Sequence, residues 1–216
     1  MRIYDISMAI HPEMTVWKDR AEKKPEFVIT RDFENGQGGR ETKISIDLHT
    51  GTHIDAPLHF IEDGNTIEHT KIEQLVRPVK VFDLSHLEER ITRKDLEGLD
   101  IQANDFILLK TRNSAIEEFD LNFVFVDRTG AEYLIEKRIA GVGIDSLGIE
   151  RDQTDHATHK GLLSNNIIII EGLRLAAVSP GEYIMVAAPL KLVNVEAAPA
   201  RIILLDCNDN VLTKDC

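Results

Sequence analysis

The alternation of apolar and polar residues along the chain predicts many short strands. A period of two, typical of half-buried strands, runs through residues 2–7 and 42–49. Residues 25–33 also have strand character, and the turn signal Asn35-Gly36 after them predicts a hairpin. Continuous apolar runs, typical of more deeply buried strands, occupy five further segments: 79–84, 105–111, 140–145, 167–170 and 201–206.

Helix-start signals occur in three segments between these strands: 92–99, 129–138 and 156–163. Thr92 and Asp95 have the spacing of a capping box, in which the two residues satisfy each other's free backbone N–H groups. Thr129 and Glu132 have the same spacing, and Asp155 can cap the third segment. The sequence therefore predicts three short helices among a larger number of strands.

These elements predict a single mixed α/β domain, rich in strands, over residues 1–216. No linker rich in Pro, Gly or Ser divides the chain. The strands do not alternate strictly with helices, which argues against a regular Rossmann or TIM-barrel arrangement. Neither GxGxxG after a strand nor GxxxxGK[ST] occurs, so nucleotide-phosphate loops have no support.

The charge balance narrows the classes of partner. The chain has 25 Lys and Arg against 37 Asp and Glu, for a net charge of −12, which argues against nucleic acid and against anionic membrane surfaces. No run reaches the roughly 18 apolar residues of a membrane span, and the N-terminus lacks the apolar core of a signal peptide. The two cysteines, Cys207 and Cys216, form no disulfide framework. We therefore expect a cytoplasmic protein.

The segment 49–59 concentrates polar groups that can meet at one point. His49, His53, Asp55 and His59 all occupy odd positions, which share one face of an extended chain. A straight strand from His49 to Asp55 would span ~20 Å at about 3.3 Å per residue, too far for ligands of one ion. We therefore predict that the chain bends at Gly51, where left-handed backbone is accessible.

Imidazole nitrogens and carboxylate oxygens together suit Zn²⁺, Mn²⁺ or Fe²⁺. Two His and one carboxylate leave coordination positions open for water, as in catalytic metal sites. A second candidate carboxylate, Glu171, closes the isoleucine run 167–170, where an unpartnered buried charge is costly. His159, on the third predicted helix, would by itself be read as a surface residue, and it becomes a candidate ligand only in company with Glu171 and the segment 49–59.

The order His49-Thr50-Gly51-Thr52-His53-Ile54-Asp55-Ala56-Pro57-Leu58-His59 resembles the HxGTHxDxPxH signature of the Putative cyclase family, which includes bacterial kynurenine formamidase (arylformamidase) and isatin hydrolase. The resemblance extends to His159 before a Leu pair and to Glu171 twelve residues later. It implies a fold of the swivelling β/β/α type and a metal-dependent hydrolase.

The family resemblance also implies a site with two divalent ions, Zn²⁺ first and Mn²⁺ second. The residues that would hold them, with Asp55 bridging the two ions, are His49, His53, Asp55, His159 and Glu171. His59 would act as general acid and base rather than as a permanent ligand. The hypothesis is that a hydroxide bridging the ions attacks the carbonyl carbon and that His59 protonates the leaving nitrogen.

The expected substrate is a small molecule, an N-formyl aryl amide such as N-formylkynurenine from tryptophan breakdown. Trp17 and Phe60 are the candidates for an aromatic pocket wall. The family often has Pro-Gly-Asp after the aromatic residue, whereas this chain has Lys18-Asp19 after Trp17. Alternatives are opening of an isatin-like cyclic amide or a lactone, and a non-catalytic protein that binds metal or a small molecule. The resemblance also implies a homodimer or a higher homo-oligomer.

Overall fold

The computed structural model describes residues 1–116, 118–151 and 153–206, so Cys207 and Cys216 lie outside the described residues. Eight of the described strands form one sheet: β1 (Arg2–Asp5), β4 (His53–Asp55), β5 (Val76–Asp83), β7 (Phe106–Lys110), β9 (Gly141–Ile144), β10 (Ile168–Glu171), β11 (Gly181–Pro189) and β12 (Ala197–Asp206). The predicted mixed, strand-rich fold is confirmed, and every predicted apolar run contains a strand.

The sheet closes on itself through the long strand β12. Its order is β1-β12-β11-β5-β7-β9-β10-β4, and β4 also pairs with β12. One edge of β12 serves two neighbours, since Ala197–Pro199 pair with β4 and Ile203–Asp206 pair with β1. A closed ring of strands protects the edges of β4 and β10. The short strand β4 is therefore held on both sides.

Alternate residues of each strand face two different cores. On β7, Leu108 joins an apolar cluster inside the ring, and Ile107 joins a second cluster outside it. On β10, Ile170 faces inward and Ile169 outward. Because side chains alternate along a strand, Glu171 belongs to the outer face with Ile169.

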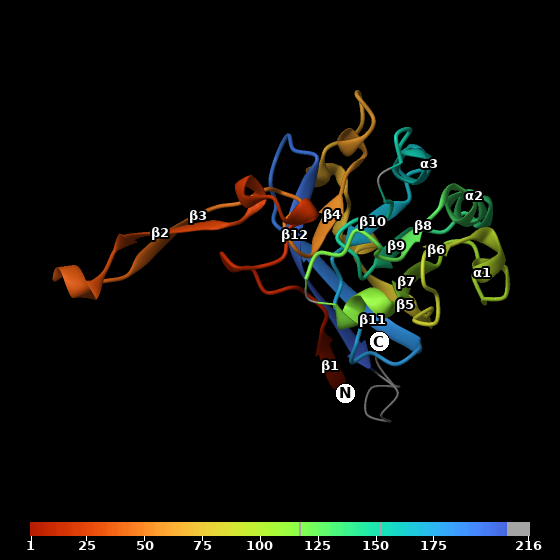
Figure 1. Ribbon diagram of the computed structural model, residues 1–216, viewed down its shortest axis with the longest axis horizontal. Helices are drawn as coiled ribbons and strands as arrows, with labels where there is room; N and C mark the ends of the chain where they lie inside the picture. The colour runs from red at the N-terminus through yellow and green to blue at the C-terminus, as the bar shows by residue number, and fades with distance from the viewer. Residues whose placement is uncertain (117, 152, 207–216) are drawn as a thin grey trace.

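Three helices cover this outer face: α1 (Arg93–Glu97), α2 (Arg128–Lys137) and α3 (Ala157–Ser164) (Figure 1). The start of α1 at Thr92 is confirmed, because Asp95 accepts hydrogen bonds from the Thr92 backbone N–H and hydroxyl at 2.8 and 2.6 Å. The capping box predicted at Thr129 is wrong. Asp127 caps α2 instead, accepting from the Gly130 N–H at 2.9 Å, while the Thr129 hydroxyl donates to Asp127.

The predicted hairpin is confirmed and projects from the body as an arm of two strands, β2 (Glu26–Arg31) and β3 (Glu41–Ser45) (Figure 1). Every residue of both strands is exposed. The predicted strand 42–49 ends at Ser45, and the chain then turns toward the sheet. A further short pair joins β6 (Arg90–Ile91) to β8 (Phe125–Val126).

Short 3-10 turns connect these elements: Trp17–Asp19, Ala21–Lys23, Phe33–Asn35, Pro57–His59, Ile67–His69, Ile72–Gln74 and Arg112–Ala115. The first two lead from the body into the arm, and the fourth follows β4 directly. Among the described residues, no helix has the length and apolar character needed to cross a membrane.

Candidate metal centre and active site

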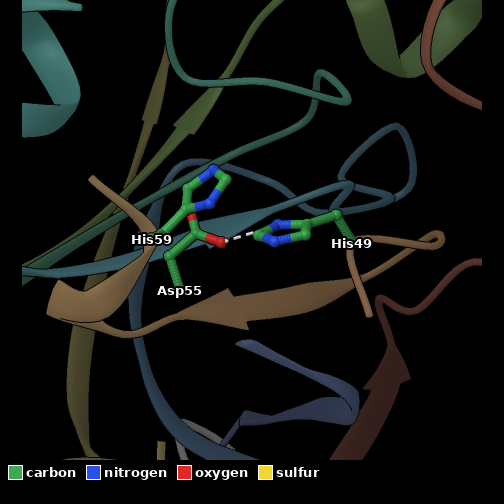
Figure 2. Close-up of side chains that lie close together, drawn as sticks. All are labelled: His49, Asp55 and His59. Carbon is green, nitrogen blue, oxygen red and sulfur yellow. Dashed lines mark ion pairs between the residues drawn. The ribbon is translucent and has the colours of Figure 1, made fainter. Parts of the chain in front are cut away.

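The predicted bend lies at Gly51, whose φ of 65° is in the left-handed region. It turns the chain so that His49 points back toward Asp55, with 3.1 Å between His49 Nδ1 and Asp55 Oδ1 (Figure 2). Gly172, after β10, is packed against the same loop, and a Cβ there would lie 2.3 Å from the Gly51 carbonyl oxygen. The close contact of two glycines therefore joins the motif to the end of β10.

Asp55 lies at the centre of the cluster. Its Oδ1 is 3.4 Å from His53 Nε2, and its Oδ2 is 3.6 Å from His159 Nε2. Glu171 contacts the same two imidazoles, at 3.3 Å from His53 Nε2 and 3.1 Å from His159 Nε2. The antiparallel register explains this meeting, because His53 pairs with Glu171 and both therefore face the outer side, beneath α3. The structure thus brings together the residues predicted as ligands.

The cluster is buried but its polar atoms are not satisfied. The exposed fractions of His53, Asp55, Glu171 and His159 are 0%, 2%, 4% and 5%. Among the described residues, neither carboxylate oxygen of Asp55 nor Nε2 of His53 has a hydrogen-bond partner. A buried carboxylate without a donor is strongly unfavourable. A divalent cation would satisfy these atoms, and the donor set of imidazole and carboxylate fits Zn²⁺ or Mn²⁺.

The pKa values in the cluster show how strongly it attracts positive charge. Burial favours a neutral imidazole, but the carboxylates of Asp55 and Glu171 outweigh it and raise the pKa of His53 to about 10. Burial likewise opposes ionisation of Glu171, yet His159 and His53 lower the pKa of that carboxyl to about 2. The cluster therefore favours positive charge, and binding of a cation would displace the proton of His53.

His59 lies beside the cluster at the end of the Pro57–His59 turn (Figure 2). Its ring centroid is 4.1 Å from that of His49 and 5.6 Å from that of His159. Burial lowers the pKa of His59 to about 4, so its imidazole is neutral at neutral pH. A neutral imidazole can accept a proton or bind a metal, and the role of general acid and base stays a prediction.

Two sets of three donors lie close enough to hold an ion within the described chain: His49, Asp55 and His59, and His53, Asp55 and Glu171. Their donor atoms lie within 4.8 Å of one another in each set. Asp55 belongs to both sets, as expected for a residue that bridges two ions. The first set includes His59, which the sequence reasoning kept apart from the ligands.

Glu150 contacts the start of α3 behind His159, and sequence reasoning missed it. Its Oε1 lies 3.2 Å from His159 Nδ1, and its Oε2 accepts from the backbone N–H groups of Thr158 and His159 at 3.0 and 3.2 Å. Glu150 is outside the spacing of any capping motif, so only the folded chain reveals it.

The cap predicted at Asp155 is wrong, because the N-cap position of α3 is His156. Asp155 accepts from the Ala157 N–H at 3.3 Å and from the guanidinium of Arg128.

A cavity of about 370 Å³ opens directly above this cluster. His59 and His159 lie on its floor, and both predicted aromatic residues, Trp17 and Phe60, lie on its wall. Trp17 packs edge-to-face on Phe123 with centroids 5.7 Å apart. Phe60 lies against His159 at 4.5 Å. The pocket thus combines a polar floor with an aromatic wall.

Comparison with known proteins agrees with this geometry. Residues 4–151 match the family model described as Putative cyclase. A protein named kynurenine formamidase from Salinibacter ruber is 30% identical over 97% of this chain and 100% of its own length. A solved structure described as a potential metal-dependent hydrolase with cyclase activity is 51% identical, with a TM-score of 0.87 over 94% of this chain and 96% of that chain.

Isatin hydrolase A from Labrenzia aggregata has the same fold, with a TM-score of 0.82 over 94% of this chain and 93% of that chain, at 23% identity. Fold and site together define a metal-dependent hydrolase, and the predicted enzyme class is confirmed. The chain belongs to the Putative cyclase family.

Proposed function

We propose that this enzyme hydrolyses the amide C–N bond of N-formyl aryl amides such as N-formylkynurenine. The observation that carries the proposal is the buried carboxylate of Asp55, whose two oxygens have no hydrogen-bond partner in the described chain and lie among three imidazoles beneath an aromatic pocket. The relative named kynurenine formamidase supports the choice of substrate.

Two divalent ions, Zn²⁺ or alternatively Mn²⁺, fit the donor atoms. Following the family resemblance, we assign one ion to His49, His53 and Asp55, and the other to Asp55, His159 and Glu171. The two sets of donors within 4.8 Å of one another share Asp55 but combine the other residues differently, as His49, Asp55 and His59 and as His53, Asp55 and Glu171. When bound, such ions supply a Lewis acid and acidify a water molecule so that hydroxide is available at neutral pH. Proton transfer and binding of the aryl ring are then carried out by side chains that line the cavity.

His59 has the position and the protonation state to transfer the proton. It is neutral at neutral pH, because burial lowers its pKa to about 4, and its ring lines the cavity. It can therefore accept a proton from attacking water and pass it to the leaving nitrogen. Trp17 and Phe60 would hold the aryl ring, and Glu150 would keep His159 oriented.

Hydrolysis of N-formylkynurenine by chelator-stripped protein, reloaded with Zn²⁺ or Mn²⁺, tests this proposal. We expect kcat/KM of about 10⁴ M⁻¹s⁻¹ or more for the loaded protein, and negligible turnover for the stripped protein. Absence of turnover with metal bound would overturn the substrate assignment. Isatin, assayed in parallel, separates the formamide from the cyclic amide.

We also propose that the enzyme acts as a homo-oligomer through its arm. Phe27 and Ile29 lie on one face of β2, and Ile44 pairs with Phe27; their exposed fractions are 41%, 49% and 46%. A two-stranded hairpin with an exposed apolar face is marginally stable alone, and such faces mark interaction sites. Light scattering tests this: Phe27→Ser should lower the measured mass, and Val28→Ser on the opposite face should not. Equal masses for wild type and Phe27→Ser, both that of one chain, would contradict it.

A further inference from the structure

Phe60, on the wall of the active-site cavity, contacts two imidazole rings at once. Its ring centroid lies 4.5 Å from that of His159 and 4.6 Å from that of His156, with the ring planes tilted by 33° and 38°. His159 belongs to the buried metal-binding cluster. In contrast, the side chain of His156 is 44% exposed and lines the cavity. The proposed mechanism uses His159 but gives no role to His156.

A single buried carboxylate contacts both of these imidazoles. Oε1 of Glu150 lies 2.7 Å from His156 Nδ1 and 3.2 Å from His159 Nδ1, and Glu150 is only 3% exposed. Hydrogen bonds to a carboxylate are stronger than those between neutral groups. The ring of His156 is therefore held at one edge by Glu150 while it packs against Phe60.

The backbone at His156 is in a conformation that few residues adopt. Its φ of 51° lies in the left-handed region, which is uncommon for residues other than glycine. Such conformations cost free energy and cluster at functional sites. His156 is the N-cap of α3, yet its side chain forms no capping hydrogen bond, and histidine is not a preferred N-cap residue. Helix capping therefore does not explain this residue, whereas the contact of its ring with Phe60 does.

The position of Phe60 also affects the neighbouring residue in the chain. Phe60 directly follows His59, and their rings lie edge-to-face with centroids 4.2 Å apart. A displacement of Phe60 would therefore move part of the aromatic wall and the imidazole that we assign to proton transfer. A half-buried ring that must be ordered when the substrate binds would lose part of its binding energy.

We propose that His156 is a positioning residue, which holds the ring of Phe60 in place to bind the aryl ring of the substrate. This inference rests on the proposed function and adds a residue that determines how tightly the aryl group is bound. His156 acts through Phe60 rather than by contact with the reacting atoms. Its contribution is that of one aromatic pair, in addition to the area that the rings bury.

Binding of benzyl alcohol to Zn²⁺-loaded protein tests the inference, because this neutral aryl molecule has no amide bond to hydrolyse. Trp17 is the only tryptophan in the sequence and lines the same cavity, so its fluorescence reports binding. His156→Asn removes the ring, and Asn tolerates the left-handed backbone. The Kd should rise about threefold to tenfold, the range for one aromatic pair. His156→Phe keeps a ring at this position and should restore most of the affinity.

A second background tests whether His156 acts through Phe60. In protein that already carries Phe60→Leu, His156→Asn should raise the Kd no further, because the two residues contribute as a pair. The same rise in both backgrounds would overturn the inference, as would a His156→Phe variant that binds as weakly as His156→Asn. His86→Asn is the control, since it removes an exposed imidazole that does not line the cavity, and it should bind as the wild type does.

Kinetics with formanilide, a neutral aryl formamide, separate this role from a structural one. His156→Asn should keep its full zinc content and show its loss of kcat/KM in KM, as expected for a contact that binds substrate and transition state equally. A fall in kcat at unchanged KM would contradict the positioning role. If the wild type does not hydrolyse formanilide, the proposed function fails, and the Kd values for benzyl alcohol still decide the inference.

Discussion

The floor and the wall of the active-site cavity are built in different ways. Beneath the floor residues His59 and His159, the side chains of His53, Asp55 and Glu171 are almost completely buried on strands that pair with one another. The wall from Trp17 to Lys23 consists of two short turns, partly exposed, with left-handed backbone at non-glycine residues. The floor is fixed by the closed sheet, whereas the wall is fixed by a few side-chain contacts. We therefore expect the buried residues of the sheet to determine the chemistry and the turns to determine the substrate.

The largest expected effect is at the centre of the floor. Asp55→Asn removes the charge that contacts three imidazoles, so bound metal should be lost and kcat/KM should fall at least about a thousandfold. Metal analysis and kinetics on the same preparation measure both quantities. Asp100→Asn, at an exposed carboxylate, is the control. Full metal content in Asp55→Asn would contradict the bridging assignment.

A substitution at His59 distinguishes a role in metal binding from a role in proton transfer. His59→Ala should keep its metal and lose activity by about 10²–10⁴-fold, the usual contribution of general acid–base catalysis. Elemental analysis beside steady-state kinetics distinguishes the two roles. A variant that loses its metal would instead place His59 among the ligands, as its approach to His49 and Asp55 permits.

Substitution of Glu150, which contacts His159 from behind, should lower metal affinity less than substitution of a predicted metal ligand does. Glu150→Gln weakens the contact that orients His159 and should lower metal affinity about 10–100-fold. Asp155→Asn, near the same helix start but exposed, should change it little. Competition with a chelator of known affinity measures both variants. Equal affinities would show that Glu150 only caps α3.

A substitution in the wall should alter substrate binding rather than metal content. Trp17→Ala removes an aromatic surface of the cavity and should lower kcat/KM for N-formylkynurenine about tenfold, at full metal occupancy. The loss should occur mainly in KM if the ring binds substrate and transition state equally. Loss of metal in this variant would mean that the wall and the floor are not independent.

The smallest effect concerns the stability of the metal-free floor. Because the folded protein raises the pKa of His53 to about 10, the protonated imidazole stabilises the metal-free protein fully below the unfolded pKa of about 6.5. This contribution disappears as the pH rises toward 10. Between pH 7 and 9.5 the midpoint of thermal unfolding should fall by at least about 2–4 °C, the shift for about 1 kcal/mol in a chain of this size. Zn²⁺-loaded protein should lack this slope, and a flat profile without metal would contradict the assigned proton.

The predictable part of the site is the part that local geometry dictates. Four polar residues at odd positions and a glycine between them predicted both the bend and the convergence of His49 with Asp55. Glu171 was predicted from the family resemblance, which has a glutamate twelve residues after His159, and from the need of a carboxylate after four isoleucines for a partner. In contrast, Glu150 could not be predicted, because its contact with His159 depends on how α3 packs over the sheet.

The fold shows the same division. Apolar runs predicted the strands, since each run fits one buried segment of the sheet. The closing pair of β4 with β12 joins segments that are far apart in sequence, and no local pattern indicates it. The start of α2 was mistaken because Thr129 and Asp127 both have cap-forming side chains, and only the fold places Asp127 against the first turn. Where two neighbouring residues can both cap a helix, the packing of the folded chain determines which of them does so.

Titration of the stripped enzyme with Zn²⁺, followed by hydrolysis of N-formylkynurenine, tests the central claim most directly. The claim is that the unpartnered atoms around Asp55 bind catalytic metal. The account predicts no activity without metal, and activity that rises with added Zn²⁺ and saturates at two ions per chain. Full activity in the stripped protein, unchanged by Zn²⁺, would contradict it.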